Sequence, residues 1–115
     1  MKIVYGIKNC STVKKVLDVL NANQVQYEFH DYKKLGVGEQ TLKNWCEQVS
    51  WEVLVNKKGT TWRQLSEEEK ESIIDQNAAI ALMQQKTSVI KRPIIEEAGN
   101  ILAIGFDEVA ISKIS

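Results

Sequence analysis

The sequence predicts an α/β fold, a mixed four-stranded sheet built in the order β-α-β, then a block of helices, then β-β-α. Three observations predict it: a short apolar segment opens the chain, apolar residues at helical spacing follow it, and a turn signal near the end separates two further apolar segments. A chain of 115 residues has the length of one domain. We therefore expect a single domain over residues 1–115, with an all-helical insertion at about residues 39–86.

The beginning of the chain predicts a β-α-β unit with parallel strands. The segment Lys2–Ile7 is β-branched and almost entirely apolar, which is typical of a strand buried on both faces. From Val13 to Leu20 apolar residues recur at i, i+3, i+4 and i+7, the spacing of one helix face. The polar and aromatic alternation of Gln26–Tyr32 then predicts a half-buried strand.

The middle of the chain predicts helices. Apolar residues at helical spacing favour a helix at about residues 39–49, and residues 56–61 form a cluster of turn-forming residues. Ser66 opens a capping box that starts a third helix, and Asn77 can cap a fourth.

The end of the chain predicts a hairpin and a last helix. Two apolar segments, 94–97 and 101–104, flank Ala98-Gly99-Asn100, which is typical of two antiparallel strands joined by a tight turn. Asp107 can cap the final helix.

Charge and composition exclude several classes of function. Lys and Arg together number 15, as do Asp and Glu, so the net charge is zero and a bulk electrostatic grip on nucleic acid is not expected. The apolar runs are too short to span a membrane, and the first residues lack the pattern of a signal peptide. Two cysteines fit a reducing compartment. We therefore expect a cytoplasmic protein with neither a nucleic-acid nor a membrane partner.

Cys10 is the strongest candidate for chemistry. It lies in Lys8-Asn9-Cys10-Ser11-Thr12, between a buried strand and a helix. The first amides of a helix have no intrahelical partner and favour a negative charge, so a thiolate there is stabilised and its pKa is lowered. The Ser11 and Thr12 hydroxyls can donate to the sulfur, and Lys8 adds a positive charge. The alternative is that Cys10 is a small core residue or a neutral cap.

The remaining candidates are weaker. Cys46 completes an apolar helix face and is read as core packing. His30 is read as an exposed surface residue, and with a single histidine no metal site is expected. Arg92 precedes the only proline, Pro93, and X-Pro bonds can be cis. Arg92 is either an arginine that meets an anionic group or an ordinary loop residue.

Three segments together, residues 5–15, 55–65 and 90–94, resemble the ArsC/Spx family, most closely its YffB-like branch. The resemblance implies a thioredoxin-like fold with a helical insertion. It also implies that Cys10 is the reactive thiol, that Thr12 helps to bind an anion, and that Arg92 contacts that anion before a cis Pro93. Members of the arsenate reductase branch recycle their cysteine with glutathione and glutaredoxin.

The sequence also departs from that family. The arsenate reductase branch surrounds its oxyanion with three arginines, of which only Arg92 is present; Asn56 stands at the second position, and the third falls near Gly105-Phe106. Losing two bidentate donors disfavours arsenate reduction. Spx regulators often carry a C-x-x-C switch, and Val13 replaces its second cysteine here.

The function we expect is that of a glutathione-dependent thiol-disulfide oxidoreductase with one nucleophilic cysteine. Glutathione would be a co-substrate, with no bound cofactor, and a glutaredoxin is a possible partner. The alternative is a non-catalytic, Spx-like module that binds an RNA polymerase subunit, and arsenate reduction ranks third. Besides the catalytic Cys10, the substrate or glutathione site is expected to comprise Lys8, Asn9, Ser11, Thr12, Arg63, Arg92 and Pro93.

Overall fold

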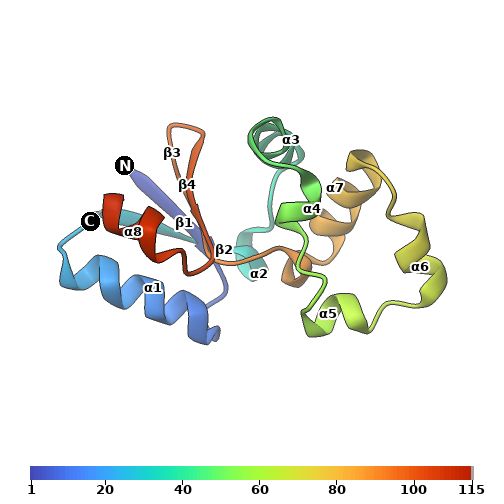
Figure 1. Cartoon of the computed structure of the whole chain (residues 1–115), viewed down its shortest axis with the longest axis horizontal. Coiled ribbons are helices and arrows are strands. Elements are labelled where there is room, and N and C mark those ends of the chain that lie inside the picture. Colours follow the sequence, from blue (N-terminus) through green and yellow to red (C-terminus); the bar gives the residue numbers. More distant parts are fainter. Residues whose placement is uncertain (115) are drawn as a thin grey trace. The chain divides into compact units, whose positions relative to one another are not determined.

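Figure 1 shows the computed structural model of the chain, which describes residues 1–114. The chain divides into two compact units: Met1–Leu35 together with the chain from Arg92 onward, and Gly36–Lys91. The single domain over residues 1–115, with an insertion at about 39–86, stays a prediction, and Ser115 lies outside the described residues.

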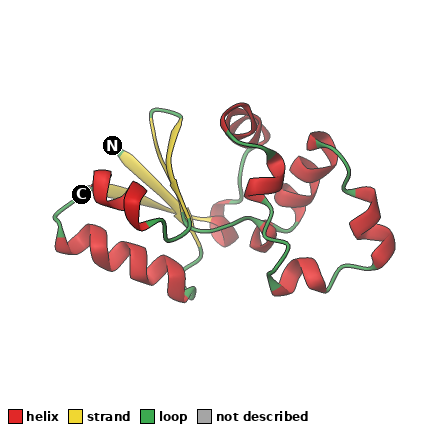
Figure 2. Ribbon diagram, in the orientation of Figure 1, coloured by secondary structure: helices red, strands yellow, loops and turns green. Residues whose placement is uncertain are grey.

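The first unit contains a four-stranded sheet, drawn in yellow in Figure 2. Its strands are β1 (Lys2–Gly6), β2 (Tyr27–Asp31), β3 (Ile94–Glu97) and β4 (Asn100–Ile104), and they lie in the order β2-β1-β3-β4. β1 pairs with β2 in parallel, whereas the β1–β3 and β3–β4 pairs are antiparallel. The predicted mixed α/β sheet is therefore confirmed.

Two helices, α1 (Ser11–Ala22) and α8 (Glu108–Ile114), lie together on one side of this sheet (Figure 1). The amide of Ala110 donates to Asp107 Oδ1 over 3.0 Å, so the predicted cap of the last helix is confirmed. The core between helices and sheet is built from the buried side chains Val4, Val16, Leu20, Ile95, Ala103 and Ile111.

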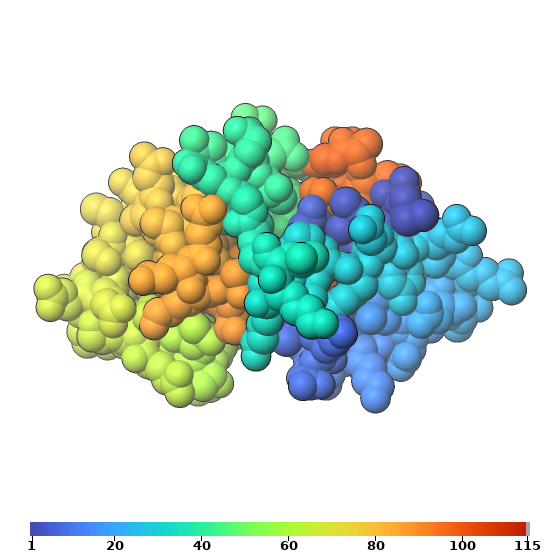
Figure 3. All heavy atoms as spheres, turned by 180° about the vertical axis from the view of Figure 1, so that it is seen from behind, coloured from blue at the N-terminus to red at the C-terminus, as the bar shows by residue number. Residues whose placement is uncertain are grey.

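The β3–β4 hairpin turns through two residues with positive φ, Ala98 at 52° and Gly99 at 84°. Positive φ at both central positions suits the right-handed twist of the flanking strands. In Figure 3 this hairpin (orange), the start of the chain (dark blue) and the β2 segment (cyan) lie side by side on one face, in agreement with the strand order.

The second unit is helical. α7 packs against α3, α4 and η1, and the largest buried side chains include Trp45, Leu42 and Met83. An isolated bridge pairs Val55 with Ile90. Among residues 1–114, no helix is long and apolar enough to cross a membrane. The elements of this unit are α3 (Glu39–Gln48), α4 (Trp51–Leu54), α5 (Thr60–Arg63), α6 (Glu67–Ser72), α7 (Gln76–Gln85) and the 3-10 helix η1 (Thr87–Val89).

The second strand ends earlier than predicted. Tyr32 does not belong to β2 but begins a short helix, α2 (Tyr32–Leu35). The cause is local, because Asp31 Oδ1 accepts a hydrogen bond of 2.9 Å from the Lys33 amide. An aspartate that bonds the amide two residues on favours a turn over continued strand.

Two of the helix starts in the second unit differ from prediction. The capping box of Ser66 with Glu69 is confirmed. The cap of α7 is Asp75, whose Oδ1 accepts from the Ala78 amide over 2.9 Å, so the expectation for Asn77 is wrong. α5 begins at Thr60, inside the predicted turn cluster.

Replacing Leu20 with alanine should destabilise the protein by about 2–5 kcal/mol, because a fully buried side chain would leave a cavity in the core. Leu35→Ala is the matched control, since Leu35 is 68% exposed, and its effect should stay within about 0.5 kcal/mol. Urea unfolding measures both. Equal losses for the two variants would contradict this description of the core.

Candidate functional site around Cys10

Cys10 is the residue at which the chain passes from the β1 side into α1. Its backbone is extended (φ −114°, ψ 123°), and its carbonyl oxygen accepts the Lys14 amide over 3.0 Å, so Cys10 is the N-cap of α1. Gly6 allows the strand to approach this helix closely, since a Cβ there would lie 3.0 Å from Val13 Cγ2. Cys10 as a whole residue is half-buried.

Opposing effects act on the Cys10 thiol. Burial raises its pKa, while the Val13 amide, a hydrogen bond from the Arg92 side chain, the Thr12 amide and the positive charge of Arg92 all lower it. The sulfur makes no full capping hydrogen bond, so the amide contacts are weaker than those of an oxygen cap. Together, the two amides and the guanidinium lower the pKa by more than burial raises it, so the pKa of Cys10 lies below its ordinary value.

Arg92 is placed by the start of β3. The Arg92–Pro93 peptide bond is cis, as the family resemblance implies, and Pro93 is buried. The carbonyl oxygen of Pro93 accepts a hydrogen bond of 2.7 Å from the Gly105 amide, which ties this segment to the end of β4. From this anchored position the half-buried Arg92 reaches the Cys10 sulfur.

The structure groups most of the other predicted site residues in the first unit. Lys8, Asn9 and Ser11 are exposed, and Thr12 is half-buried. Thr12 lowers the pKa of Cys10 through its backbone amide. Among the described residues 1–114, the groups that lower this pKa include neither the Ser11 hydroxyl nor the Thr12 hydroxyl. Arg63 is exposed at the end of α5 in the second unit, and its place in the site stays a prediction.

A surface hollow runs along the first turns of α1, and the residues that line it begin with Ser11, which follows Cys10 in the chain. Its volume is about 440 Å³, and its lining includes Ser11 and Thr12. Lys14, Lys15 and Asp18 complete it, so two of the five lining side chains carry a positive charge. This surface offers cations to the carboxylates of a small ligand.

A buried polar cluster in the same unit was not predicted from the sequence. The Tyr5 hydroxyl donates to Glu96 Oε1 over 3.0 Å, and both side chains are buried. Burial and then the hydrogen bond to Glu96 raise the pKa of Tyr5, so this hydroxyl remains protonated. The Tyr32 ring centroid lies 6.1 Å from that of Tyr5. The signal available in the sequence was two acidic residues, Glu96 and Glu97, in the second half of the short third strand.

The two remaining candidates lie elsewhere. Cys46 is half-buried in α3, and burial raises the pKa of its thiol, in contrast to Cys10. His30 is half-buried rather than exposed, because its ring packs on Tyr5 with centroids 4.6 Å apart.

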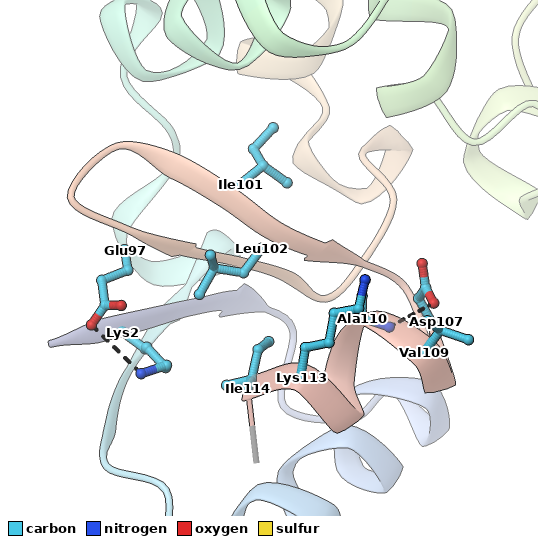
Figure 4. A pocket seen from close by; sticks show the side chains of 9 residues that line it. All are labelled: Lys2, Glu97, Ile101, Leu102, Asp107, Val109, Ala110, Lys113 and Ile114. Atoms are coloured by element: carbon cyan, nitrogen blue, oxygen red, sulfur yellow. Dashed lines mark hydrogen bonds and ion pairs between the residues drawn. The ribbon is translucent and has the colours of Figure 1, made fainter.

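A larger hollow of about 540 Å³ lies between β4 and α8 and involves neither cysteine. Figure 4 shows the Lys2–Glu97 ion pair at one end of it and Asp107 with Val109 at the other. We place the candidate site at Cys10 instead, because its thiol has a lowered pKa and no cysteine lines this hollow. Over residues 1–114, no cluster of three or more His, Cys, Asp or Glu side chains could hold a metal ion.

Replacing Arg92 with glutamine should raise the pKa of Cys10, since both a hydrogen bond and a positive charge to the thiolate are lost. Between the pKa values of the two proteins the wild type holds more thiolate, so its alkylation by iodoacetamide should be faster there and converge at high pH. The profiles are measured in a Cys46→Ser background. Lys14→Gln, which removes an exposed cation from α1, is the matched control. An equal effect of both variants would contradict a specific role for Arg92.

The similarity of this chain to known proteins shows its family. Residues 5–114 match the ArsC family. An uncharacterized protein of Haemophilus influenzae is 44% identical over 108 residues, which cover 94% of this chain and 93% of that protein. The solved structure of a YFFB protein is 38% identical, with a TM-score of 0.92 and coverage of 99% of this chain and 98% of that one. An arsenate reductase (ArsC) related protein from Brucella melitensis is also 38% identical, with a TM-score of 0.76 and coverage of 97% and 92%. The chain therefore belongs to the ArsC family and has its thioredoxin-like fold.

Proposed function

We propose that this protein is a glutathione-dependent thiol-disulfide oxidoreductase whose nucleophile is the Cys10 thiolate. The observation that supports it most is the lowered pKa of a half-buried cysteine that receives a hydrogen bond from Arg92. A thiolate attacks disulfides, whereas a thiol does not. The structures of relatives that are described as arsenate reductases or related proteins agree with thiol-based reduction.

In the proposed reaction the Cys10 thiolate attacks one sulfur of a disulfide. A bond forms between the Cys10 sulfur and the attacked sulfur, the original disulfide bond breaks, and the other sulfur leaves as a thiolate. A second thiol, glutathione or one from a glutaredoxin, then attacks the mixed disulfide and releases the Cys10 thiolate. The amides of Thr12 and Val13 stabilise the anion at the start and at the end of this cycle.

The surface around Cys10 suits a small anionic thiol. Glutathione carries carboxylates, and the hollow along the first turns of α1 presents Lys14 and Lys15 beside a single carboxylate, Asp18. Lys8, Asn9 and Ser11 are exposed at the same end of α1, and Arg92 lies at the sulfur. Arg63 remains part of the proposal as a further carboxylate partner. No bound cofactor is needed for this chemistry.

Arsenate reduction is less well supported. Arg92 is the guanidinium that acts on Cys10, and Asn56 stands where the arsenate reductase branch carries a second arginine. At the third position, Lys15 Nζ lies 4.8 Å from the ring centroid of Phe106. A lysine binds an oxyanion as a point charge and lacks the bidentate geometry of arginine. The alternative as a non-catalytic module that binds an RNA polymerase subunit stays a prediction.

Intact-mass spectrometry after mixing with oxidised glutathione tests the proposal. The wild type and Cys46→Ser should each gain one glutathione, and Cys10→Ser should gain none, because the Cys46 thiol has a raised pKa and little thiolate. Removal of the adduct by reduced glutathione should restore the original mass. An adduct that persists in Cys10→Ser, or a wild type that gains none, would refute the assignment of the nucleophile.

A further inference from the structure

The Tyr32 hydroxyl is a buried polar group on which the positive charge of Arg92 acts. Tyr32 is 1% exposed, and among residues 1–114 its hydroxyl oxygen is buried without a hydrogen-bond partner. A buried hydroxyl that makes no hydrogen bond costs stability, and phenylalanine would avoid that cost at the same volume. A buried tyrosine therefore suggests that the hydroxyl finds a partner in another state of the protein.

The neighbours of Tyr32 narrow the choice of that partner. Its ring lies beside Tyr5, with centroids 6.1 Å apart, and His30 lies 6.5 Å away edge to face. The Glu96 carboxylate already accepts a hydrogen bond from the Tyr5 hydroxyl. Burial raises the pKa of Tyr32, Tyr5 and Glu96 raise it further, and the positive charge of Arg92 opposes them. The Tyr32 hydroxyl is thus neutral, and its oxygen can accept a hydrogen bond from Arg92, the cation whose charge acts on it.

Arg92 is also the cation that interacts with the Cys10 sulfur. While Cys10 is a thiolate, the Arg92 side chain donates a hydrogen bond to its sulfur. In a mixed disulfide the same sulfur carries no charge and is a weak acceptor. The half-buried guanidinium then gains from a new acceptor, since a buried donor without one is costly.

We propose that Tyr32 is a positioning residue whose hydroxyl oxygen accepts a hydrogen bond from Arg92 when Cys10 is in a mixed disulfide. This rests on the proposed function, in which that intermediate forms. Tyr32 takes no part in the bond exchange: the Cys10 thiolate displaces one glutathione thiolate from oxidised glutathione, so one disulfide bond forms and one breaks. The effect of Tyr32 is to stabilise the mixed disulfide relative to the thiolate.

The test compares Tyr32→Phe with the parent in a Cys46→Ser background. The equilibrium constant for the mixed disulfide, measured by intact mass over a series of ratios of reduced to oxidised glutathione, should fall about fivefold, the effect of one hydrogen bond of ordinary net strength. The pKa of Cys10 should not change, and the reduced variant should be at least as stable to urea as its parent. Tyr27→Phe is the matched control, because the Tyr27 hydroxyl donates to Asn21 on the surface; it should leave the equilibrium constant unchanged.

An unchanged equilibrium constant in Tyr32→Phe, or a fall that Tyr27→Phe reproduces, would overturn the role of Tyr32 while leaving the proposed function intact. A shift in the Cys10 pKa that accounts for the whole effect would overturn it as well. If the parent forms no adduct with oxidised glutathione, the proposed function fails; the same comparison with bis(2-hydroxyethyl) disulfide then tests Tyr32 alone, with the same fivefold fall expected.

A measurement on the unmutated side chain covers the case in which Tyr32→Phe does not fold. In protein with isotope-labelled tyrosine, the resonance of the ring carbon that bears the hydroxyl should shift for Tyr32 on formation of the mixed disulfide and stay in place for Tyr27. No shift at Tyr32 would overturn the proposal.

Discussion

The stabilisation of a thiolate at Cys10 against the cost of burying it is the interaction on which the site depends. Burial alone would raise the pKa of this thiol, as it does for Cys46. The difference between the two cysteines lies in their neighbours: Cys46 lies within α3, whereas Cys10 caps α1 and meets the Val13 and Thr12 amides and Arg92. The same fold thus lowers the pKa of one thiol and raises the pKa of the other.

The sheet brings these partners together from distant parts of the sequence. β1 leads into the Cys10 segment, and its neighbour β3 begins directly after Arg92–Pro93. The pairing of Tyr5 with Ile94 therefore fixes where the arginine enters relative to the cysteine. The same strands carry Tyr5 and Glu96, so the buried Glu96 acid and the half-buried Arg92 cation both act on Tyr32. Because electrostatic interactions are strong where water is largely excluded, the loss of one of these charges would change the balance at the Tyr32 hydroxyl.

Local sequence patterns predicted the elements that depend on interactions between residues close in sequence. The helical spacing of apolar residues predicted α1. Short side chains that can accept a hydrogen bond from a backbone amide predicted the caps at Ser66 and Asp107. Cys10 stood out as a candidate because its place between strand and helix is a local feature, while the choice of an anion contact over an ordinary loop residue for Arg92 rested on the family resemblance. The Tyr5–Glu96 pair was out of reach, since it joins residues 91 positions apart and depends on which strands pair in the sheet. The end of β2 was misjudged because a single Asp31 hydrogen bond outweighed the alternating pattern.

The most direct test is a nuclear magnetic resonance titration of Cys10, isotope-labelled at its Cβ, in the folded protein and in the same chain unfolded in urea. The account predicts a lower pKa in the folded state, so the folded protein gains stability as the pH rises from the folded-state pKa to the unfolded-state pKa, and loses it again on acidification. A folded-state pKa equal to or above that of the unfolded chain would contradict it.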